Sequence, residues 1–309
     1  MEAERVTNFS AIPMRYALFL MALGSLSATG CRAIEQRIVF SPYAYPEKWC
    51  EATAEELSGL CLEDVWFESL DGTRLHGWFV RPQGNVSRNP VLFAHGRAGN
   101  VSSYKDKLFT FVRQTQANVF LFDYRGYGKS DGYPTEEGLY CDVQAGRDWL
   151  ARRAGVDPSE VLLMGRSLGA AAVIDLAARQ GGKALIIQSS FTSTPDVLKH
   201  HTHGILNGSR MMTCFNSECK IGAYTGPVFI SHSTEDRALP YAQGVRLAEA
   251  ATRASRVVFM ELSGGHSVPP GHDYYAVLGD FLDSVTNSNR VSEFPKTDLA
   301  ACSLGFIKR

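Results

Sequence analysis

The chain has almost no net charge, since 31 basic side chains are balanced by 32 acidic ones in 309 residues. A nucleic-acid-binding domain usually has a strong basic excess, so we expect no nucleic-acid partner. Seven cysteines occur without a CxxC pair or a Cys/His spacing typical of zinc, and we expect no metal and no cofactor. The length and the 45% hydrophobic content suit one large globular domain.

A long hydrophobic run is also missing. The apolar run near the N-terminus, residues 16–26, is too short for a helix to cross a bilayer comfortably. Arg15 precedes it and small residues lead to Cys31, an order typical of a secretory signal peptide and similar to a bacterial lipobox. We expect residues 1–31 to be a signal peptide or N-terminal anchor, with lipid on Cys31 holding an exported protein at the membrane of the bacterial envelope. A cytoplasmic protein is the alternative, and Met14 is as good a candidate start as the first methionine.

Export would permit disulfides. The cysteines closest in sequence are Cys50 with Cys61 and Cys214 with Cys219. Each pair is a candidate disulfide, and free buried thiols are equally compatible with the sequence.

Residues 32–59 are rich in aromatic side chains and proline, whereas a linker would be polar. We therefore expect an irregular arm that lies over the domain. The main domain is expected over residues 60–287, and residues 288–309 form a C-terminal tail to which the sequence assigns no function.

Within residues 60–287, strand-like runs at 64–69 and 74–80 flank Asp71-Gly72, a strong hairpin signal. Short buried-strand patterns then alternate with helical ones, which predicts a parallel sheet with helices on both faces. These strand patterns lie at 91–94, 118–123, 160–164, 183–188, 227–231 and 256–262. Residues 190–226 fit neither pattern and are expected to form a small irregular cap.

The most informative stretch is Gly165-Arg166-Ser167-Leu168-Gly169, which fits G-x-S-x-G between a strand pattern and a small-residue helix pattern. Such a turn exposes the serine hydroxyl above the sheet, and a larger side chain at either glycine would collide with a neighbouring element. An ordinary turn whose serine only caps the helix would look similar if the pentapeptide stood alone. Its context favours Ser167 as a nucleophile.

Each polar loop of interest follows a predicted strand. Because the carboxyl ends of parallel strands meet at one edge of a sheet, these loops are expected to converge there. They span residues 95–100, 124–132, 165–169, 232–240 and 263–272.

Taken in order, these motifs resemble the α/β-hydrolase superfamily over about residues 60–285. More narrowly, the chain resembles the prolyl-oligopeptidase-related group of small serine esterases, including membrane-anchored bacterial members. That likeness rests on residues 35–42, on His95-Gly-Arg-Ala-Gly-Asn100 and on Tyr124-Arg-Gly-Tyr-Gly-Lys-Ser-Asp-Gly132.

The resemblance implies a catalytic triad. A serine hydroxyl needs a base, and His266 follows Ser167 in the chain order serine, acid, histidine that this fold uses, with His272 as the alternative. Asp236 is the expected acid, in a segment similar to the family's H-G-x-x-D but with Ser233 in place of the glycine. Glu235 is the alternative acid.

The oxyanion hole is expected from the backbone N–H groups of Leu168 and Arg97, while His95 is expected to be structural. Together these assignments predict a serine hydrolase that cleaves small-molecule esters, thioesters or lipid-like substrates. A peptidase is the alternative enzyme, made less favourable because the long propeller domain of the large peptidases is absent. A non-catalytic binding protein on a hydrolase scaffold is the third possibility.

Overall fold

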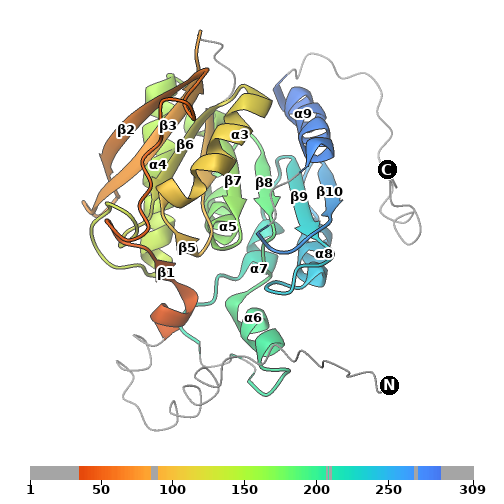
Figure 1. Cartoon of the computed structure of the whole chain (residues 1–309). Coiled ribbons are helices and arrows are strands. Elements are labelled where there is room, and N and C mark those ends of the chain that lie inside the picture. The colour runs from red at the N-terminus through yellow and green to blue at the C-terminus, as the bar shows by residue number, and fades with distance from the viewer. Residues whose placement is uncertain (1–34, 85–89, 207, 209–210, 268–270, 287–309) are drawn as a thin grey trace, which may run out of the picture.

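The structure is a computed structural model that describes residues 35–84, 90–206, 208, 211–267 and 271–286. Within these residues, eight strands form one sheet in the order β10-β9-β8-β7-β4-β6-β3-β2 (Figure 1). Neighbours are parallel except at the two pairs that involve β3. The strands are β2 Leu60–Glu68, β3 Arg74–Pro82, β4 Pro90–Ala94, β6 Asn118–Asp123, β7 Leu162–Arg166, β8 Leu185–Gln188, β9 Val228–Ser233 and β10 Val257–Leu262. The predicted α/β architecture is confirmed.

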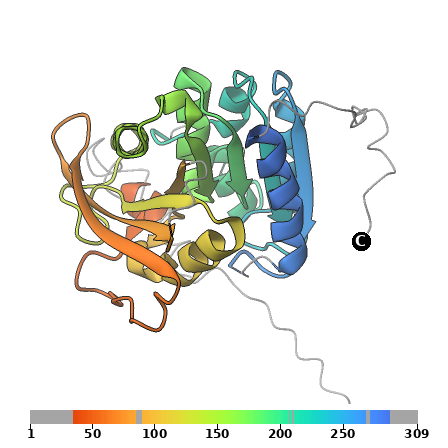
Figure 2. The same cartoon turned by 90° about the horizontal axis from the view of Figure 1, so that it is seen from above.

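Helices cover both faces of the sheet because alternate strand residues point to opposite sides. Leu163 packs in the apolar cluster with α4 and α5, whereas Leu162 and Met164 pack in the cluster with α3 and α9. Figure 2 shows the two helical layers flanking the sheet. The helices are α3 Lys105–Thr115, α4 Glu136–Ala154, α5 Leu168–Gln180, α8 Tyr241–Ala250 and α9 His272–Thr286.

The predicted hairpin is present and is longer than expected. β2 and β3 pair antiparallel from Leu60 opposite Pro82 to Glu68 opposite Arg74. At the turn Gly72 has φ 81°, a left-handed conformation that glycine adopts without a steric penalty.

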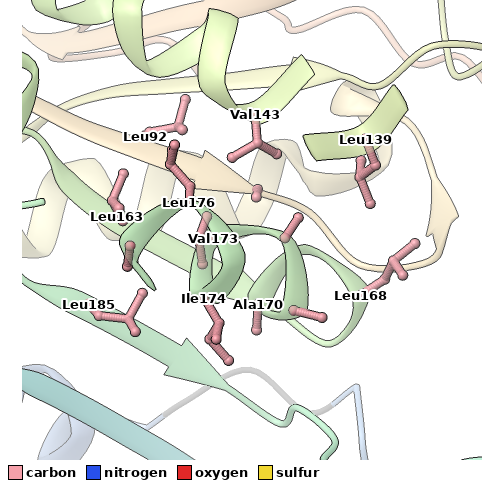
Figure 3. Close-up of a cluster of buried hydrophobic side chains, with 14 of the residues drawn as sticks. Leu92, Leu139, Val143, Leu163, Leu168, Ala170, Val173, Ile174, Leu176 and Leu185 are labelled. Atoms are coloured by element: carbon pink, nitrogen blue, oxygen red, sulfur yellow. The ribbon is translucent and has the colours of Figure 1, made fainter. Parts of the chain in front are cut away.

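Helix α5 lies at the centre of the larger apolar cluster. Its buried side chains pack in one cluster with Leu92 of β4, Leu163 of β7 and Leu185 of β8, and with Leu139 and Val143 of α4 (Figure 3). The run of alanines in α5 explains this position, because small side chains let the helix approach the sheet closely. The N-terminus of α5 is therefore held rigidly at the carboxyl end of β7.

The expectation of an irregular cap over residues 190–226 is wrong in part. Two short helices form there, α6 Thr194–His201 and α7 Ser217–Ile221, capped by the side chains of Ser193 and Asn216. Capping supplies partners for the first N–H groups of these helices, so even short segments become helical. Phe215, Ile221 and Tyr224 are buried in the main cluster, so the second half of the segment is part of the domain body. The sequence did not predict α7, because a helix of 5 residues is too short to show the helical repeat of apolar side chains.

The arm packs along the domain. Residues 35–39 are helical, and β1 Ser41–Pro42 pairs with β5 Ala98–Gly99. The Asn100 side-chain amide donates to the carbonyls of Tyr43 and Glu47, so the arm is fixed against the loop after β4.

Both proposed disulfides are contradicted, because Cys50, Cys61, Cys214 and Cys219 are free thiols. Cys50 lies in the arm, where Ser102 accepts from its backbone N–H, whereas Cys61 lies in β2 opposite Arg81. Cys219 lies in the middle of α7, whereas Cys214 precedes the Asn216 cap of that helix.

Among the described residues, none of the helices has the length and apolar character needed to cross a bilayer. The predictions for residues 1–31, including Cys31 and the start site, and for the tail 288–309 lie outside the described residues.

Candidate active site

Ser167 occupies a sharp turn between β7 and α5, with φ 52° and ψ −116°. This backbone conformation is unfavourable for a residue with a side chain, and such strain is often concentrated at functional sites. A Cβ atom at Gly165 would collide with the backbone of Ala170, and one at Gly169 would collide with the carbonyls of Ala94 and His95. Only glycine at both positions permits this turn, as the sequence pattern predicts.

The loop after β4 lies beside the serine. A Cβ atom built on Gly96 would be 3.5 Å from Cβ of Ser167. The hydroxyl of Tyr104 accepts from the Gly96 N–H at 3.0 Å, and Tyr127 donates to the Arg97 carbonyl at 2.8 Å. The Gly96–Arg97 segment, which is expected to supply one oxyanion donor, is thus held next to Ser167. The first turn of α5, which contains Leu168, packs against the same loop.

His95 is fully buried in this loop. Its Nδ1 donates to the Gly96 carbonyl at 2.8 Å, and its ring packs 4.1 Å from the Tyr124 ring. Burial lowers the pKa of the imidazole, which is therefore neutral at pH 7. These contacts fit the structural role expected for His95.

The structure brings Asp236 and His266 together. Nδ1 of His266 lies 2.6 Å from Oδ2 of Asp236, across loops that follow β9 and β10. Oδ1 of Asp236 accepts the backbone N–H groups of Ala238 and Leu239 at 2.9 Å each. The carboxylate has no proton to give, so Nδ1 of His266 carries the proton and Nε2 is left as the basic atom.

Asp236 is buried and its pKa is held well below the usual range. Burial alone would raise that pKa, but hydrogen bonds from His232, His266 and the Leu239 N–H outweigh it. The acid is therefore ionised throughout the neutral range.

His232 is a neighbour that the sequence did not single out. Its Nε2 donates to the Leu239 carbonyl at 2.9 Å and lies 3.5 Å from Oδ2 of Asp236. A Cβ atom at Gly244 would lie 2.6 Å from Nδ1 of His232, so the ring has no room to turn. The first position of the H-G-x-x-D-like segment was the signal that could have identified it.

The alternative acid and base are placed less favourably. Glu235 is exposed whereas Asp236 is buried, and His272 is an exposed residue at the start of α9. Among the described residues, no hydrogen bond joins either side chain to Ser167, Asp236 or His266. The geometry therefore favours Asp236 and His266 as a pair.

The hydrogen bonds of the described residues include none between Ser167 and His266. The two are connected through Arg166, whose guanidinium donates to the backbone carbonyl of His266. A shallow hollow adjoins His266, lined by residues 234–238 together with Gly265, and Ser167 is not among its lining residues. The catalytic roles of the triad and the oxyanion donors accordingly stay predictions.

Among the described residues, no group of three histidine, cysteine or carboxylate side chains is arranged to hold a metal ion. His200 and His201 lie at the end of α6, where His201 contacts the Ala238 carbonyl.

Comparison with known proteins gives related sequences of similar length. A family model described as serine aminopeptidase, S33, matches residues 86–207. The α/β hydrolase domain-containing protein WAV2 of Arabidopsis thaliana is 32% identical over 253 residues, covering 75% of this chain and 82% of that protein. The human α/β hydrolase domain-containing protein 17B is 33% identical over 218 residues, covering 68% and 72%. The uncharacterized protein YfhR of Escherichia coli K12 is 31% identical over 236 residues, covering 73% and 82%.

Among solved structures, an esterase of Pyrococcus furiosus superposes with a TM-score of 0.63 at 20% identity, covering 81% of this chain and 99% of that one. That likeness supports the fold alone. The sheet order, the serine turn and the 32% identity to WAV2, which covers 75% of this chain, lead to one conclusion: the chain belongs to the α/β-hydrolase superfamily.

Proposed function

We propose that this protein is a serine hydrolase that cleaves carboxylic esters or thioesters through an acyl-serine intermediate. The observation that carries the proposal is the 2.6 Å contact between His266 Nδ1 and Asp236 Oδ2, which leaves Nε2 of His266 free to act as a base. Ser167, on its strained turn beside the Gly96 loop, is the nucleophile that this base would serve.

In the proposed reaction, Nε2 of His266 takes the Ser167 proton as Oγ attacks the carbonyl carbon. Asp236 stabilises the resulting imidazolium without itself becoming protonated. The backbone N–H groups of Leu168 and Arg97 would bind the oxyanion, each contributing about 3 kcal/mol. His266 then protonates the leaving group, and a water molecule releases the acyl group by the same route in reverse.

Ester substrates are part of this proposal because several proteins of the same fold are esterases, among them those of Pyrococcus furiosus and Rhodothermus marinus and one from an Arctic metagenomic library. The finer resemblance to the prolyl-oligopeptidase-related group is part of the same proposal. Export, attachment of lipid to Cys31 and a resulting preference for lipid-like substrates are further parts of it. Mass analysis of the native N-terminus tests the lipid: an intact Met1 or Met14 would refute processing at Cys31.

An aminopeptidase is the second candidate, because the matching family model is described as a serine aminopeptidase. The same triad would serve either reaction, so the leaving group separates the two. A non-catalytic binding protein is the third candidate, and the presence of all three triad side chains argues against it.

The decisive experiment compares wild type with Ser167→Ala. Wild type should react with a fluorophosphonate probe and hydrolyse p-nitrophenyl esters or acyl thioesters faster than aminoacyl p-nitroanilides. Ser167→Ala should lose both labelling and hydrolysis while keeping its circular dichroism spectrum. Labelling that persists in Ser167→Ala would refute the nucleophile, and faster cleavage of the anilides would favour the peptidase.

A further inference from the structure

The loop that carries His266 has little burial of its own. Residues 263–267 follow β10, the edge strand of the sheet, and every one of them is exposed or only half-buried. Asp236 holds the imidazole at one nitrogen, which leaves the backbone of the loop free to shift unless other groups hold it. Small displacements matter here, since misplacing a catalytic group by about 1 Å can cost 10²-fold in rate.

Arg166 contacts this loop from the side of the nucleophile. It is the last residue of β7, directly before Ser167, and its side chain is buried. Its guanidinium donates to the carbonyl of His266, and its other terminal nitrogen would lie 3.4 Å from a Cβ atom on Gly96. One side chain therefore lies between the loop after β4 and the loop after β10.

The charge of Arg166 is otherwise unused. Among the described residues, no carboxylate lies within ion-pair distance of Arg166, although a buried cation is normally paired. A neighbouring cation, Lys107, has a pKa lowered by burial and by the charge of Arg166. A guanidinium placed here at an electrostatic cost is better explained by its contact with the His266 carbonyl than by stability.

Ser233 contacts the same loop from the side of the acid. It ends β9, and its hydroxyl donates to the Gly264 carbonyl while accepting the Glu235 N–H at 3.2 Å. In the H-G-x-x-D pattern of the family that this segment resembles, the position of Ser233 is glycine. The substitution therefore adds a hydrogen bond between the loop that bears Asp236 and the loop that bears His266.

We propose that Arg166 and Ser233 are positioning residues, which hold the backbone of residues 263–267 from opposite sides and so fix the His266 imidazole between Ser167 and Asp236. The proposal rests on the proposed function for its catalytic consequence. The holding of the loop itself is a separate physical claim, and the two can be measured apart.

The test compares Arg166→Met, which keeps the aliphatic stem, and Ser233→Ala with wild type. Ser231→Ala is the control. It removes a buried hydroxyl of β9 that bonds to the Ile187 carbonyl and to Tyr274, and among the described residues this hydroxyl makes no hydrogen bond to residues 263–267. Amide hydrogen exchange is followed on peptides covering residues 262–267. We expect the amides of residues 262–267 to exchange roughly 10-fold faster in Arg166→Met and in Ser233→Ala than in wild type. In Ser231→Ala their exchange rate should be unchanged.

Hydrolysis of a p-nitrophenyl ester is measured with the same variants, alone and combined with His266→Ala. Each variant should lower kcat by about 10-fold or more with KM nearly unchanged. In the His266→Ala background the further loss should disappear, because the two side chains act through His266. A purely structural role would lower the residual rate equally in both backgrounds.

Unchanged exchange over residues 262–267 in both variants would overturn the proposal, as would kcat losses that persist in the His266→Ala background. If wild type hydrolyses nothing and takes up no fluorophosphonate, the proposed function fails. The exchange rates would then still show whether Arg166 and Ser233 hold the loop.

Discussion

At the scale of single residues, the site depends on which hydrogen-bonding partner each side chain faces. His266 has its Nδ1 on a buried carboxylate that two backbone N–H groups also hold, so its tautomer is fixed by the structure around Asp236. The nearby Glu235 has the same chemistry but is exposed, so it cannot hold a ring in this way.

Asp236→Asn should test this dependence. The amide keeps the shape of the side chain, but it can donate to Nδ1 and so favour the tautomer in which Nε2 is protonated. We expect kcat for ester hydrolysis to fall by about 10⁴-fold with the fold unchanged. A loss below 10-fold, or an equal loss in Glu235→Gln, would mean that Asp236 is not the acid.

Two glycines in helices should respond oppositely to alanine. Gly169→Ala would place a methyl group against the carbonyls of Ala94 and His95, whereas a Cβ atom at Gly279 in α9 would meet nothing within 4 Å. Urea unfolding should show Gly169→Ala less stable by about 1–3 kcal/mol. Gly279→Ala should be more stable by about 0.5–1 kcal/mol, and a loss in both would contradict the packing at Gly169.

At the scale of elements, the loop from β6 to α4 is held by a buried ion pair. Asp142 in α4 accepts from Arg125 and from the hydroxyl of Ser69, and Arg125 also pairs with Asp71. The loop held in this way includes Tyr124 and Tyr127, whose hydroxyls donate to the carbonyls of His95 and Arg97 beside the serine. The hairpin turn and α4 thus contribute to the position of the candidate oxyanion loop.

Removing one member of that pair should be costly. Asp142→Ala removes the fully buried partner of the mostly buried Arg125 guanidinium and should lower the free energy of unfolding by about 3–5 kcal/mol. Asp71→Ala removes a half-exposed partner and should cost less than about 1 kcal/mol. Chemical denaturation of the two variants is the measurement, and equal losses would refute the distinction between buried and exposed partners.

At the scale of the whole molecule, the arm and the domain behave as one packed unit. The Trp49 ring lies 5.7 Å from the rings of both His76 and Trp78, and Lys129 lies 4.5 Å from its centroid. The ion pair of Glu56 with Lys105 adds a contact further along the arm.

Trp49→Ala should therefore destabilise the entire domain rather than release the arm alone. We expect a single unfolding transition with a loss of roughly 2 kcal/mol, below the value for a fully buried tryptophan because Trp49 is only half-buried. Thermal unfolding monitored by fluorescence and by circular dichroism should coincide. Two separate transitions would show that the arm is independent.

The stability of the whole molecule should fall in acid in two stages. Burial lowers the pKa of His95 in the folded protein. Below about pH 6.5 the His95 imidazole therefore binds a proton in the unfolded chain but stays neutral in the folded protein, and the free energy of unfolding falls. The pKa of Asp236 is lowered in the folded protein, so the ionised carboxylate stabilises the fold above about pH 3.9. This stabilisation is lost as the pH falls further and the carboxylate is protonated. Urea midpoints measured from pH 8 to pH 4 should decline for wild type and decline less for His95→Gln. An equal decline in both would exclude His95 as the source of the first stage.

The candidate site could be predicted in outline because its residues lie where strands end. Ser167, Asp236 and His266 each follow a strand whose apolar pattern is clear in the sequence, and parallel strands place such positions at one edge. The sequence left Glu235 and His272 open as alternatives, because neighbours in a loop differ only in which way they point. It missed Arg166, whose hydrogen bond to the His266 carbonyl joins segments 100 residues apart. It also missed His232, whose contacts with Asp236 and Leu239 depend on how the loop after β9 folds back.

The amino-acid sequence by itself determined the alternation of strands and helices, the hairpin at Asp71-Gly72 and the glycines around Ser167, because each depends on local periodicity or local sterics. Only the tertiary structure decided that Phe215, Ile221 and Tyr224 belong to the core rather than to a cap. It also decided that the four described cysteines of the two candidate pairs stay free, and that Asp236 rather than Glu235 faces His266. Burial and pairing of this kind depend on distance in space, which a pattern of neighbours in sequence does not contain.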